Sequence, residues 1–510
     1  MRFGFFLILF LATATAGENT AATLATVKAA AVELEKLAAN EIRATGIPGL
    51  AVVVVYKDEV IFAKGFGVRE SGKKDAVDAD TVFQLASLSK PIASTVVASV
   101  VGNGLATWDS RISDLDPGFE MFDPWVTREI TVKDFFAHRS GLPDHAGDDL
   151  EDLGFSRAEV LRRLRYQPPN SSFRSAYAYT NFGLTEAAVA VARATGKSWE
   201  DLSEEQLYKP LGMSSTSSRY EDFRNQPNHA SGHVLVDGRW MPKYQRDPDA
   251  QSPAGGVSSS VNDLAKWMRL QLAGGLFKGR QVVAADALSE THHPQILTGF
   301  NLNGLPAFYG LGWNVGYDPQ GRLRLSHSGA FSLGASTAVF LVPAEQLGVA
   351  VLTNATPLGV AEELAALFLD YALYGKPTAD WLKIYKDAFA KMQAAEAAEI
   401  ADYSHPPTSP APAAPLASYV GTYANSLFGE ASVVETDGSL TLLLGPQKTP
   451  HALIHWSRDT FVYQTASESS AGQAGVFFSV GPGGMATSLA VENLNTLGEG
   501  TFQRTVSLKD

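Results

Sequence analysis

The sequence predicts an α+β fold: an antiparallel sheet flanked by N- and C-terminal helices, with a helical subdomain, followed by a small all-β domain. Two β-rich runs, 50–56 and 60–66, are joined by a short polar turn and read as a hairpin. Three more β-rich runs lie between residues 322 and 352 and precede an apolar helix. These two distant regions can share one sheet. Between them, helical patterns alternate with loops rich in Gly, Pro and Asp.

Each element has its own signal. The first helix, 21–45, is rich in Ala and Glu with apolar residues at helical spacing, and Gly46 and Pro48 end it. The later strands are expected at 322–326, 337–342 and 348–352, and the helix after them at 360–374. The middle of the chain, roughly 87–271, is expected to carry the binding loops.

A proline-rich stretch, 406–412, marks the clearest domain boundary, and a helical segment at 379–401 precedes it. Beyond it, short β-rich runs punctuated by Gly, Asp and Ser favour a small sandwich or barrel. The predicted divisions are a signal peptide, the main domain, a helix with linker and a C-terminal domain, at 1–16, 17–375, 376–414 and 415–510.

Composition narrows the class of protein. The chain has 510 residues, 45% of them hydrophobic and 19% charged, as in soluble globular proteins. The net charge of -13 and the lack of a Lys and Arg cluster argue against nucleic acid as a partner. There are no cysteines, which excludes disulfides, Cys-bound metal and a thiol nucleophile.

The first sixteen residues have the layout of a secretory signal. Met1 and Arg2 precede an apolar run, and Ala14-Thr15-Ala16 forms a cleavage motif. The run is shorter than the roughly 20 residues needed to span a bilayer, which disfavours a membrane anchor. We therefore expect a periplasmic or secreted protein with no membrane span after signal removal.

The strongest chemical signal is Ser87 with Lys90, three positions apart where an apolar helical run begins. On a helix the two side chains share one face, and the helix start favours a developing negative charge. A lysine whose pKa is lowered by burial can take the serine proton. The pattern therefore predicts a nucleophile and its base.

The spacing alone is weak, because Ser71 and Lys74 match it in what reads as an exposed turn. Order and setting separate the candidates. Tyr179 and Asn181 stand just before a helix, and His327 is expected to end a strand at the edge of the sheet. The plain structural alternatives are a packed aromatic for Tyr179, a helix cap for Asn181 and a core histidine for His327.

With these elements in order, the chain resembles the serine β-lactamase and penicillin-binding protein superfamily, in its class C-like branch with D-aminopeptidases, D-alanyl-D-alanine carboxypeptidases and esterases. The segments 136–143 and 253–259 look like two further recurring loops of that family, and the likeness covers about residues 25–375. It implies a β-lactamase-like fold for this part of the chain.

The resemblance implies a role for each site residue. Ser87 would be acylated, Lys90 would be its base, and Tyr179 would relay the proton to the leaving group. Asn181 would hold Lys90 and the substrate amide. The backbone N–H groups of Ser87 and Ala330 would form the oxyanion hole.

The third motif departs from the class C β-lactamases, which carry Lys-Thr-Gly where this chain has His327, Ser328 and Gly329. A histidine of ordinary pKa is mostly neutral at pH 7 and anchors a substrate carboxylate less firmly than lysine does. This favours a small peptide or ester as the substrate over a β-lactam. The leading hypothesis is an amidase or peptidase, possible substrates being D-amino-acid-containing or nonribosomal peptides. The alternatives are a carboxylesterase or weak β-lactamase, and a non-catalytic penicillin-binding sensor.

For several other segments and residues, the sequence predicts no catalytic or binding role. The segment from about residue 419 resembles a small lipocalin-like β-barrel of unknown function often appended to such hydrolases. The acidic run at 148–152 reads as a solvated loop, and His138 as a structural residue bonded to its own loop. The pair His292 and His293 lacks the spacing of a metal site, so no cofactor and no metal are expected. The oligomeric state is left open.

Overall fold

The computed structural model describes residues 21–300, 305–465, 468 and 472–505. The predicted signal peptide lies outside the described residues. Within them, no helix combines the length and the apolar character needed to cross a bilayer.

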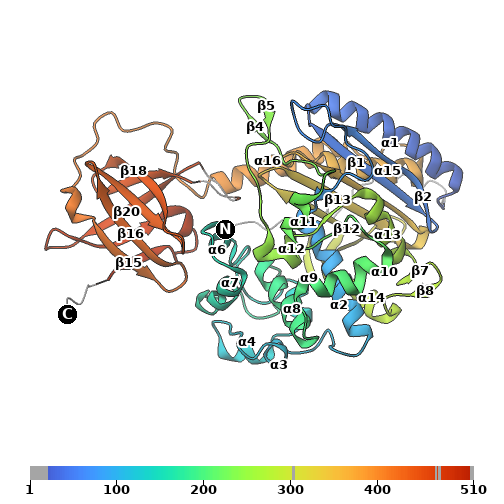
Figure 1. Cartoon of the computed structure of the whole chain (residues 1–510), viewed down its shortest axis with the longest axis horizontal. Coiled ribbons are helices and arrows are strands. Elements are labelled where there is room, and N and C mark those ends of the chain that lie inside the picture. Colours follow the sequence, from blue (N-terminus) through green and yellow to red (C-terminus); the bar gives the residue numbers. More distant parts are fainter. Residues whose placement is uncertain (1–20, 301–304, 466–467, 469–471, 506–510) are drawn as a thin grey trace.

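An eight-stranded sheet, in the order β2-β1-β14-β13-β12-β11-β10-β9, forms the centre of the larger part of the chain (Figure 1). The N-terminal hairpin, β1 (Gly49–Tyr56) and β2 (Glu59–Gly67), pairs through β1 with β14 (Leu347–Thr353). Next come β13 (Ala335–Val342) and β12 (Leu323–Phe331). The predicted sharing of one antiparallel sheet by both ends of this region is confirmed.

Three strands of the sheet were not predicted from the sequence. They are β11 (Asn314–Tyr317), β10 (Pro306–Tyr309) and β9 (Ile296–Phe300). All three are short, and Gly and Pro punctuate the segment that carries them. They extend the sheet past β12, which therefore does not lie at its edge.

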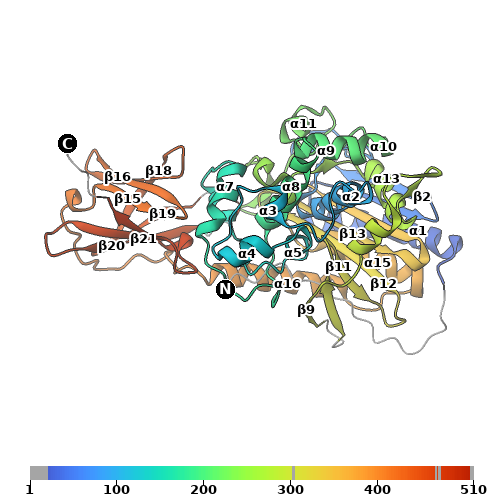
Figure 2. The ribbon, with the colours of Figure 1, turned by 90° about the horizontal axis from the view of Figure 1, so that it is seen from below.

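Both faces of the central strands are buried because helices cover each side (Figure 2). Alternate residues of β1 join different cores: Leu50, Val52 and Val54 pack in one, and Val53 and Val55 in the other. The first core lies against α1 (Leu24–Thr45) and α15 (Val360–Tyr374), and α16 (Trp381–Ala397) packs on α15. The second lies against α2 (Ser89–Gly102) and α13 (Val261–Leu272).

The middle of the chain forms the predicted helical region with loops. Its other helices are α3 (Ile112–Leu115), α4 (Pro124–Glu129), α5 (Val132–Phe136), α6 (Asp148–Asp152), α7 (Arg157–Arg163), α8 (Asn181–Ala194), α9 (Trp199–Ser203), α10 (Lys209–Leu211), α11 (Tyr220–Asn225), α12 (Ser252–Gly255) and α14 (Ala285–Thr291). Three small ladders accompany them: β3 (Phe83–Gln84) with β6 (Ser258–Ser259), β4 (Val234–Val236) with β5 (Arg239–Met241), and β7 (Leu276–Phe277) with β8 (Arg280–Gln281).

The C-terminal segment is a closed antiparallel barrel of eight strands, so the barrel form of the expected small all-β domain is confirmed. The strands are β15 (Gly421–Asn425), β16 (Gly429–Thr436), β17 (Ser439–Leu444), β18 (Thr449–Ser457), β19 (Thr460–Gln464), β20 (Gln473–Val480), β21 (Ala486–Val491) and β22 (Thr501–Arg504). The barrel contacts the helical region: Arg163 donates to the Leu427 carbonyl oxygen at 2.7 Å, and Gln167 donates to the Glu499 carboxylate at 2.7 Å.

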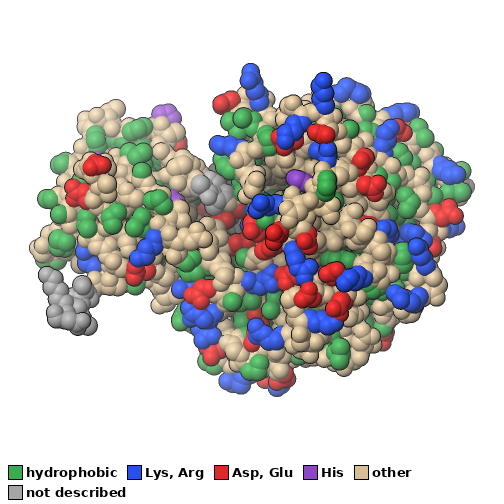
Figure 3. Space-filling view, in the orientation of Figure 1, with side chains coloured by type: hydrophobic (Ala, Val, Ile, Leu, Met, Phe, Trp, Pro, Cys, Tyr) green, Lys and Arg blue, Asp and Glu red, His purple; other side chains and the backbone are tan. Residues whose placement is uncertain are grey.

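Charge is distributed without an obvious stripe on the face in Figure 3, where basic and acidic side chains are intermixed over the larger part of the molecule.

Candidate active site

Ser87 lies in a 3₁₀ turn, Ala86–Leu88, that leads directly into α2 at Ser89. The nucleophile candidate therefore precedes the α-helix by one short turn instead of standing inside it. Ala86 has φ 48°, in the left-handed region that non-glycine residues seldom adopt. This backbone turn leaves Ser87 half-buried while its neighbours Ala86 and Leu88 are fully buried.

Lys90 is fully buried, and its Nζ makes three hydrogen-bond contacts. They are to Asn181 Oδ1 at 2.6 Å, the Ala254 carbonyl oxygen at 3.0 Å and Ser87 Oγ at 3.0 Å. The first two partners are oxygens that only accept, so they take two N–H groups. A neutral amine has only two, which turns its lone pair toward the serine hydroxyl.

Burial favours this neutral amine. It lowers the pKa of Lys90 well below its usual value, and the negative charge of Asp148 opposes the shift only in part. Lys90 is therefore prepared to accept the Ser87 proton.

Asn181 is the first residue of α8, and Thr180 occupies the cap position, so Asn181 is not the helix cap that the sequence offered as an alternative. Its Nδ2 donates to Asp148 Oδ2 at 2.8 Å. Because a carboxylate only accepts, this bond holds the amide with Oδ1 facing Lys90. Asp148 also contacts His145 Nδ1 at 2.7 Å.

The interpretation of residues 148–152 as a solvated loop was wrong. Asp148 supports Asn181, and the Glu151 side chain is 7% exposed and pairs with Arg246 at 2.6 Å. Burial raises the pKa of Glu151 to about 7. The sequence carried no local signal for these contacts, because the partners lie 33 and 95 positions away.

Tyr179 is buried beside the nucleophile. Its phenol hydrogen-bonds the Ser87 side chain, and its ring centroid lies 4.4 Å from Lys90 Nζ. Burial raises the pKa of Tyr179, and the charges of Asp148 and Asp144 raise it further. The phenol therefore keeps its proton in the resting site, where it can serve as an acid.

His327 lies in the middle of β12, so the prediction that it ends an edge strand was wrong. The ladder between β11 and β12 stops at Ser326, which leaves His327 beside a local gap in the sheet. Its Nδ1 donates to the Ser328 carbonyl oxygen at 2.7 Å, and its Nε2 is 2.8 Å from the Tyr309 hydroxyl. Since Nδ1 carries the hydrogen, Nε2 accepts from Tyr309.

This environment fixes the charge of His327. Burial lowers the pKa of His327 to about 3. A neutral ring with both nitrogens engaged offers no cation to a substrate carboxylate, so His327 is a poorer anchor than the sequence suggested. Tyr309, which completes this contact, was missed because it lies on the unpredicted strand β10.

Gly329 marks the closest approach of β12 to the turn that carries Ser87. A Cβ atom there would lie under 3.0 Å from the Leu85 carbonyl oxygen, the Thr337 hydroxyl and the Leu88 amide nitrogen. Thr337 also donates to the Leu85 carbonyl oxygen at 2.7 Å. Ala330 follows and is partly exposed, one residue beyond this contact.

The remaining histidines have structural contacts. His138 Nδ1 accepts from the Thr180 amide at 3.2 Å. Its partner therefore belongs to the segment of Tyr179, whereas the sequence predicted a bond within the loop of His138 itself. His292 Nε2 lies 3.0 Å from Gln271 Oε1. Among residues the structure describes, no cluster of three or more His, Cys, Asp or Glu could hold a metal.

One residue of the barrel, Glu468, contacts the segment just after β12. The Ser332 amide, just after β12, donates to the Glu468 carboxylate. Arg246 lies 3.6 Å from Glu468 and also pairs with Glu151. This cluster of ion pairs joins the barrel to the segment that follows β12.

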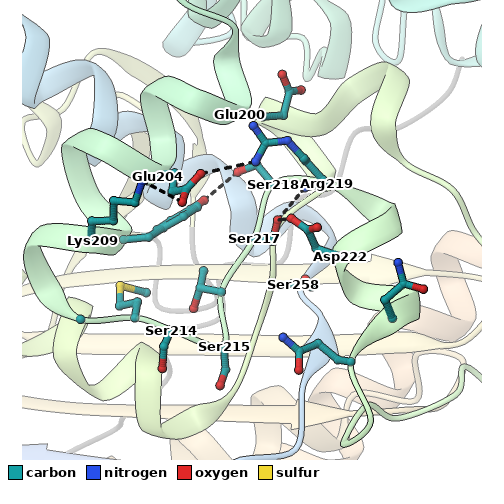
Figure 4. A pocket seen from close by; sticks show the side chains of 16 residues that line it. Glu200, Glu204, Lys209, Ser214, Ser215, Ser217, Ser218, Arg219, Asp222 and Ser258 are labelled. Carbon is teal, nitrogen blue, oxygen red and sulfur yellow. Dashed lines mark hydrogen bonds and ion pairs between the residues drawn. The ribbon is translucent and has the colours of Figure 1, made fainter.

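A larger cavity lies elsewhere, on the helical region (Figure 4). It measures about 580 Å³ and is lined largely by the polar segment 214–219. Ser217 donates to Asp222 at 2.6 Å and Arg219 lies 3.6 Å from Glu204 within it. Neither Ser87 nor Lys90 lines this cavity, so its size does not identify it as the reactive centre.

Comparisons with known proteins identify families and relatives that this chain resembles. A family model described as Beta-lactamase matches residues 34–373, and one described as a domain of unknown function, DUF3471, matches 405–504. Unguisins hydrolase ungD' of Aspergillus campestris is 28% identical over 482 residues, covering 87% of this chain and 86% of that protein. Penicillin-binding protein 4 of Amycolatopsis lactamdurans is 28% identical over 60% of this chain and 81% of its own.

Two further similarities extend the picture. The D-alanyl-D-alanine-carboxypeptidase/endopeptidase AmpH of Escherichia coli is 23% identical over 62% of this chain and 81% of that protein. The octameric penicillin-binding protein homologue from Pyrococcus abyssi shares the fold, with a TM-score of 0.59 and 18% identity over 90% of this chain and 98% of that one. With its matched family model and its Ser87, Lys90 and Tyr179 in one site, the chain belongs to the beta-lactamase family.

Proposed function

We propose that this protein is a serine hydrolase that cleaves an amide bond of a small peptide through an acyl-enzyme on Ser87. The observation that carries the proposal is the arrangement around Lys90 Nζ. Two acceptors take its hydrogens, and the Ser87 hydroxyl lies 3.0 Å away on the remaining side. A buried neutral amine in this position is a general base.

In the proposed acylation, Lys90 takes the Ser87 proton as Oγ forms a bond to the substrate carbonyl carbon. The oxyanion is stabilised by the backbone N–H groups of Ser87 and Ala330, at about 3 kcal/mol or more for each donor. As the C–N bond breaks, Tyr179 gives its proton to the leaving nitrogen, and the proton held by Lys90 replaces it. Water then attacks the ester and the same groups carry its proton, which releases the acid and restores Ser87.

The substrate is proposed from the site and the relatives together. Unguisins hydrolases align along most of the chain, beyond the matched Beta-lactamase region and into the barrel. The neutral His327 offers no charge for a carboxylate. Both observations favour a neutral peptide substrate over a β-lactam, and we propose that the enzyme acts outside the cytoplasm after export.

Labelling with a fluorophosphonate probe tests the nucleophile. Wild-type protein should be labelled at Ser87 and should hydrolyse members of a peptide panel, whereas Ser87→Ala should lose both activities by about 1000-fold or more. Ser71→Ala is the matched control, because Ser71 stands at the same spacing from Lys74 in an exposed turn. Labelling at another serine, or hydrolysis that survives Ser87→Ala, contradicts the proposal.

A further inference from the structure

A small cavity lies beside Tyr179, the residue next to the nucleophile in the active site. It lies at the gap where β11 stops pairing with β12, and its walls include Tyr309, His327, Glu362 of α15 and Phe389 of α16. Its free volume is about 20 Å³, room for one water-sized polar group. Because Tyr179 lines it, the cavity stands on the side where the proposed acid meets the leaving group.

Glu362 is the unusual wall of this cavity. Its side chain is almost fully buried at 2% exposure, and neither carboxylate oxygen has a well-formed hydrogen bond among the described residues. The neighbouring Ser328 side chain offsets the cost of burial only in part, and burial raises the pKa of Glu362 to about 7. A buried carboxyl group without a partner is costly unless something binds to it.

The cavity holds no compensating positive charge. Neither Lys nor Arg is among the residues that line it, and His327 is neutral with both ring nitrogens engaged. An anion entering here would face Glu362 in a poorly solvated space, where like charges repel strongly. An amide N–H or a hydroxyl would instead supply the missing donor.

We infer that this cavity is the leaving-group subsite, and that Glu362 selects leaving groups that present an uncharged hydrogen-bond donor and rejects a free carboxylate. The inference rests on the proposed function, since it needs Tyr179 to act on the leaving group. It narrows the substrate class to peptides cut at an internal amide, as in a longer or cyclic chain. Removal of a single C-terminal residue, whose leaving amino acid carries a carboxylate, is disfavoured.

Two aryl esters of one acyl group test this selection. The leaving groups are 3-carbamoylphenol and 3-carboxyphenol. The first presents an uncharged N–H donor, and the second presents an ionised carboxylate at the same position of the ring. At pH 8, above the pKa of about 7 of Glu362, wild-type kcat/KM should favour the carbamoyl ester by at least about tenfold. Glu362→Gln keeps the shape and removes the charge, so the preference should shrink to about threefold or less.

Glu363→Gln is the matched control. Glu363 is the next residue of α15, is also buried, and has its pKa raised to about 8, but it faces Glu41 and Asp380 and does not line the cavity. This variant should keep the wild-type preference. Equal rates on both esters in the wild type, or a preference unchanged in Glu362→Gln, overturns the inference.

The two proposals fail in distinguishable ways. If hydrolysis of both esters depends on Ser87 but shows no preference, the enzyme is a serine hydrolase and Glu362 has no selecting role. If neither ester is hydrolysed and the fluorophosphonate does not label Ser87, the proposed function fails and the subsite fails with it.

Discussion

Hydrogen-bond chemistry around single atoms decides how this site is set up. Lys90, Asn181 and Asp148 form a chain in which each group has only one arrangement compatible with its neighbours. The spacing of Ser87 and Lys90 was readable from the sequence because one helical turn places both on a face. The roles of Asp148, Tyr309 and Glu362 could not be predicted from the sequence, because their contacts join segments that lie far apart in the chain.

Asp148 supplies a prediction at this scale. In Asp148→Ala, Asn181 loses the partner that orients it, so kcat should fall by about 100-fold with little change in KM. Asp148→Asn keeps an acceptor and should retain most of kcat. However, it removes the negative charge that raises the pKa of Lys90. Lys90 then stays deprotonated to lower pH, and the acidic limb of the kcat/KM profile should move to lower pH.

Steady-state kinetics from pH 5 to 10 measure both effects, with Asp149→Ala on the same helix as the control. A purely structural role for Asp148 would lower the thermal midpoint in both variants and leave the pH profile of the remaining activity in place. That result would contradict the assignment.

At the scale of elements, the active site depends on how closely β12 approaches the turn before α2. The sequence predicted the first helix, the hairpin and the last helix of the sheet domain well, because long segments show clear periodicity. It missed β9, β10 and β11, whose short runs carry too few residues for a pattern. It therefore placed His327 at an edge that the extra strands remove.

Gly329→Ala tests the importance of this approach. The added methyl group would meet backbone atoms of Leu85 and Leu88 at less than 3.0 Å, so the turn that holds Ser87 must shift. We expect kcat/KM to fall by about 100-fold, with a loss of stability of about 1 to 3 kcal/mol. Fluorophosphonate labelling rates and urea unfolding measure the two effects. Full activity in this variant would show that the spacing is not needed.

At the scale of the whole molecule, buried acids control the dependence of stability on pH. The folded-state pKa is raised from 4.5 to about 7 for Glu151, Glu362 and Glu468 and to about 8 for Glu186 and Glu363. Between pH 4.5 and 8 the folded protein therefore binds more protons than the unfolded chain, so stability falls as pH rises. The buried His138 and His327 and the partly buried His292 have lowered pKa values and oppose this trend below about pH 6.5.

The fall in stability should thus be steepest between about pH 6.5 and 8. We expect the thermal midpoint to drop by at least about 3 °C from pH 6 to pH 8. Glu186→Gln, in a buried position on α8, should reduce the drop without changing activity. Differential scanning calorimetry at pH 6 and pH 8 measures the thermal midpoint of the wild type and the variant. A midpoint that rises with pH contradicts the role of the buried glutamates.

The contact between Glu468 and the Ser332 amide has a consequence for any truncated form of the protein that lacks the barrel. A fragment that stops before the proline-rich stretch would lack the carboxylate that contacts the Ser332 amide after β12, and Arg246 would lose one of its two carboxylate partners and keep Glu151. The segment after β12 would therefore be left with more positive charge than in the intact chain. Selectivities recorded on such a fragment would describe a different catalyst.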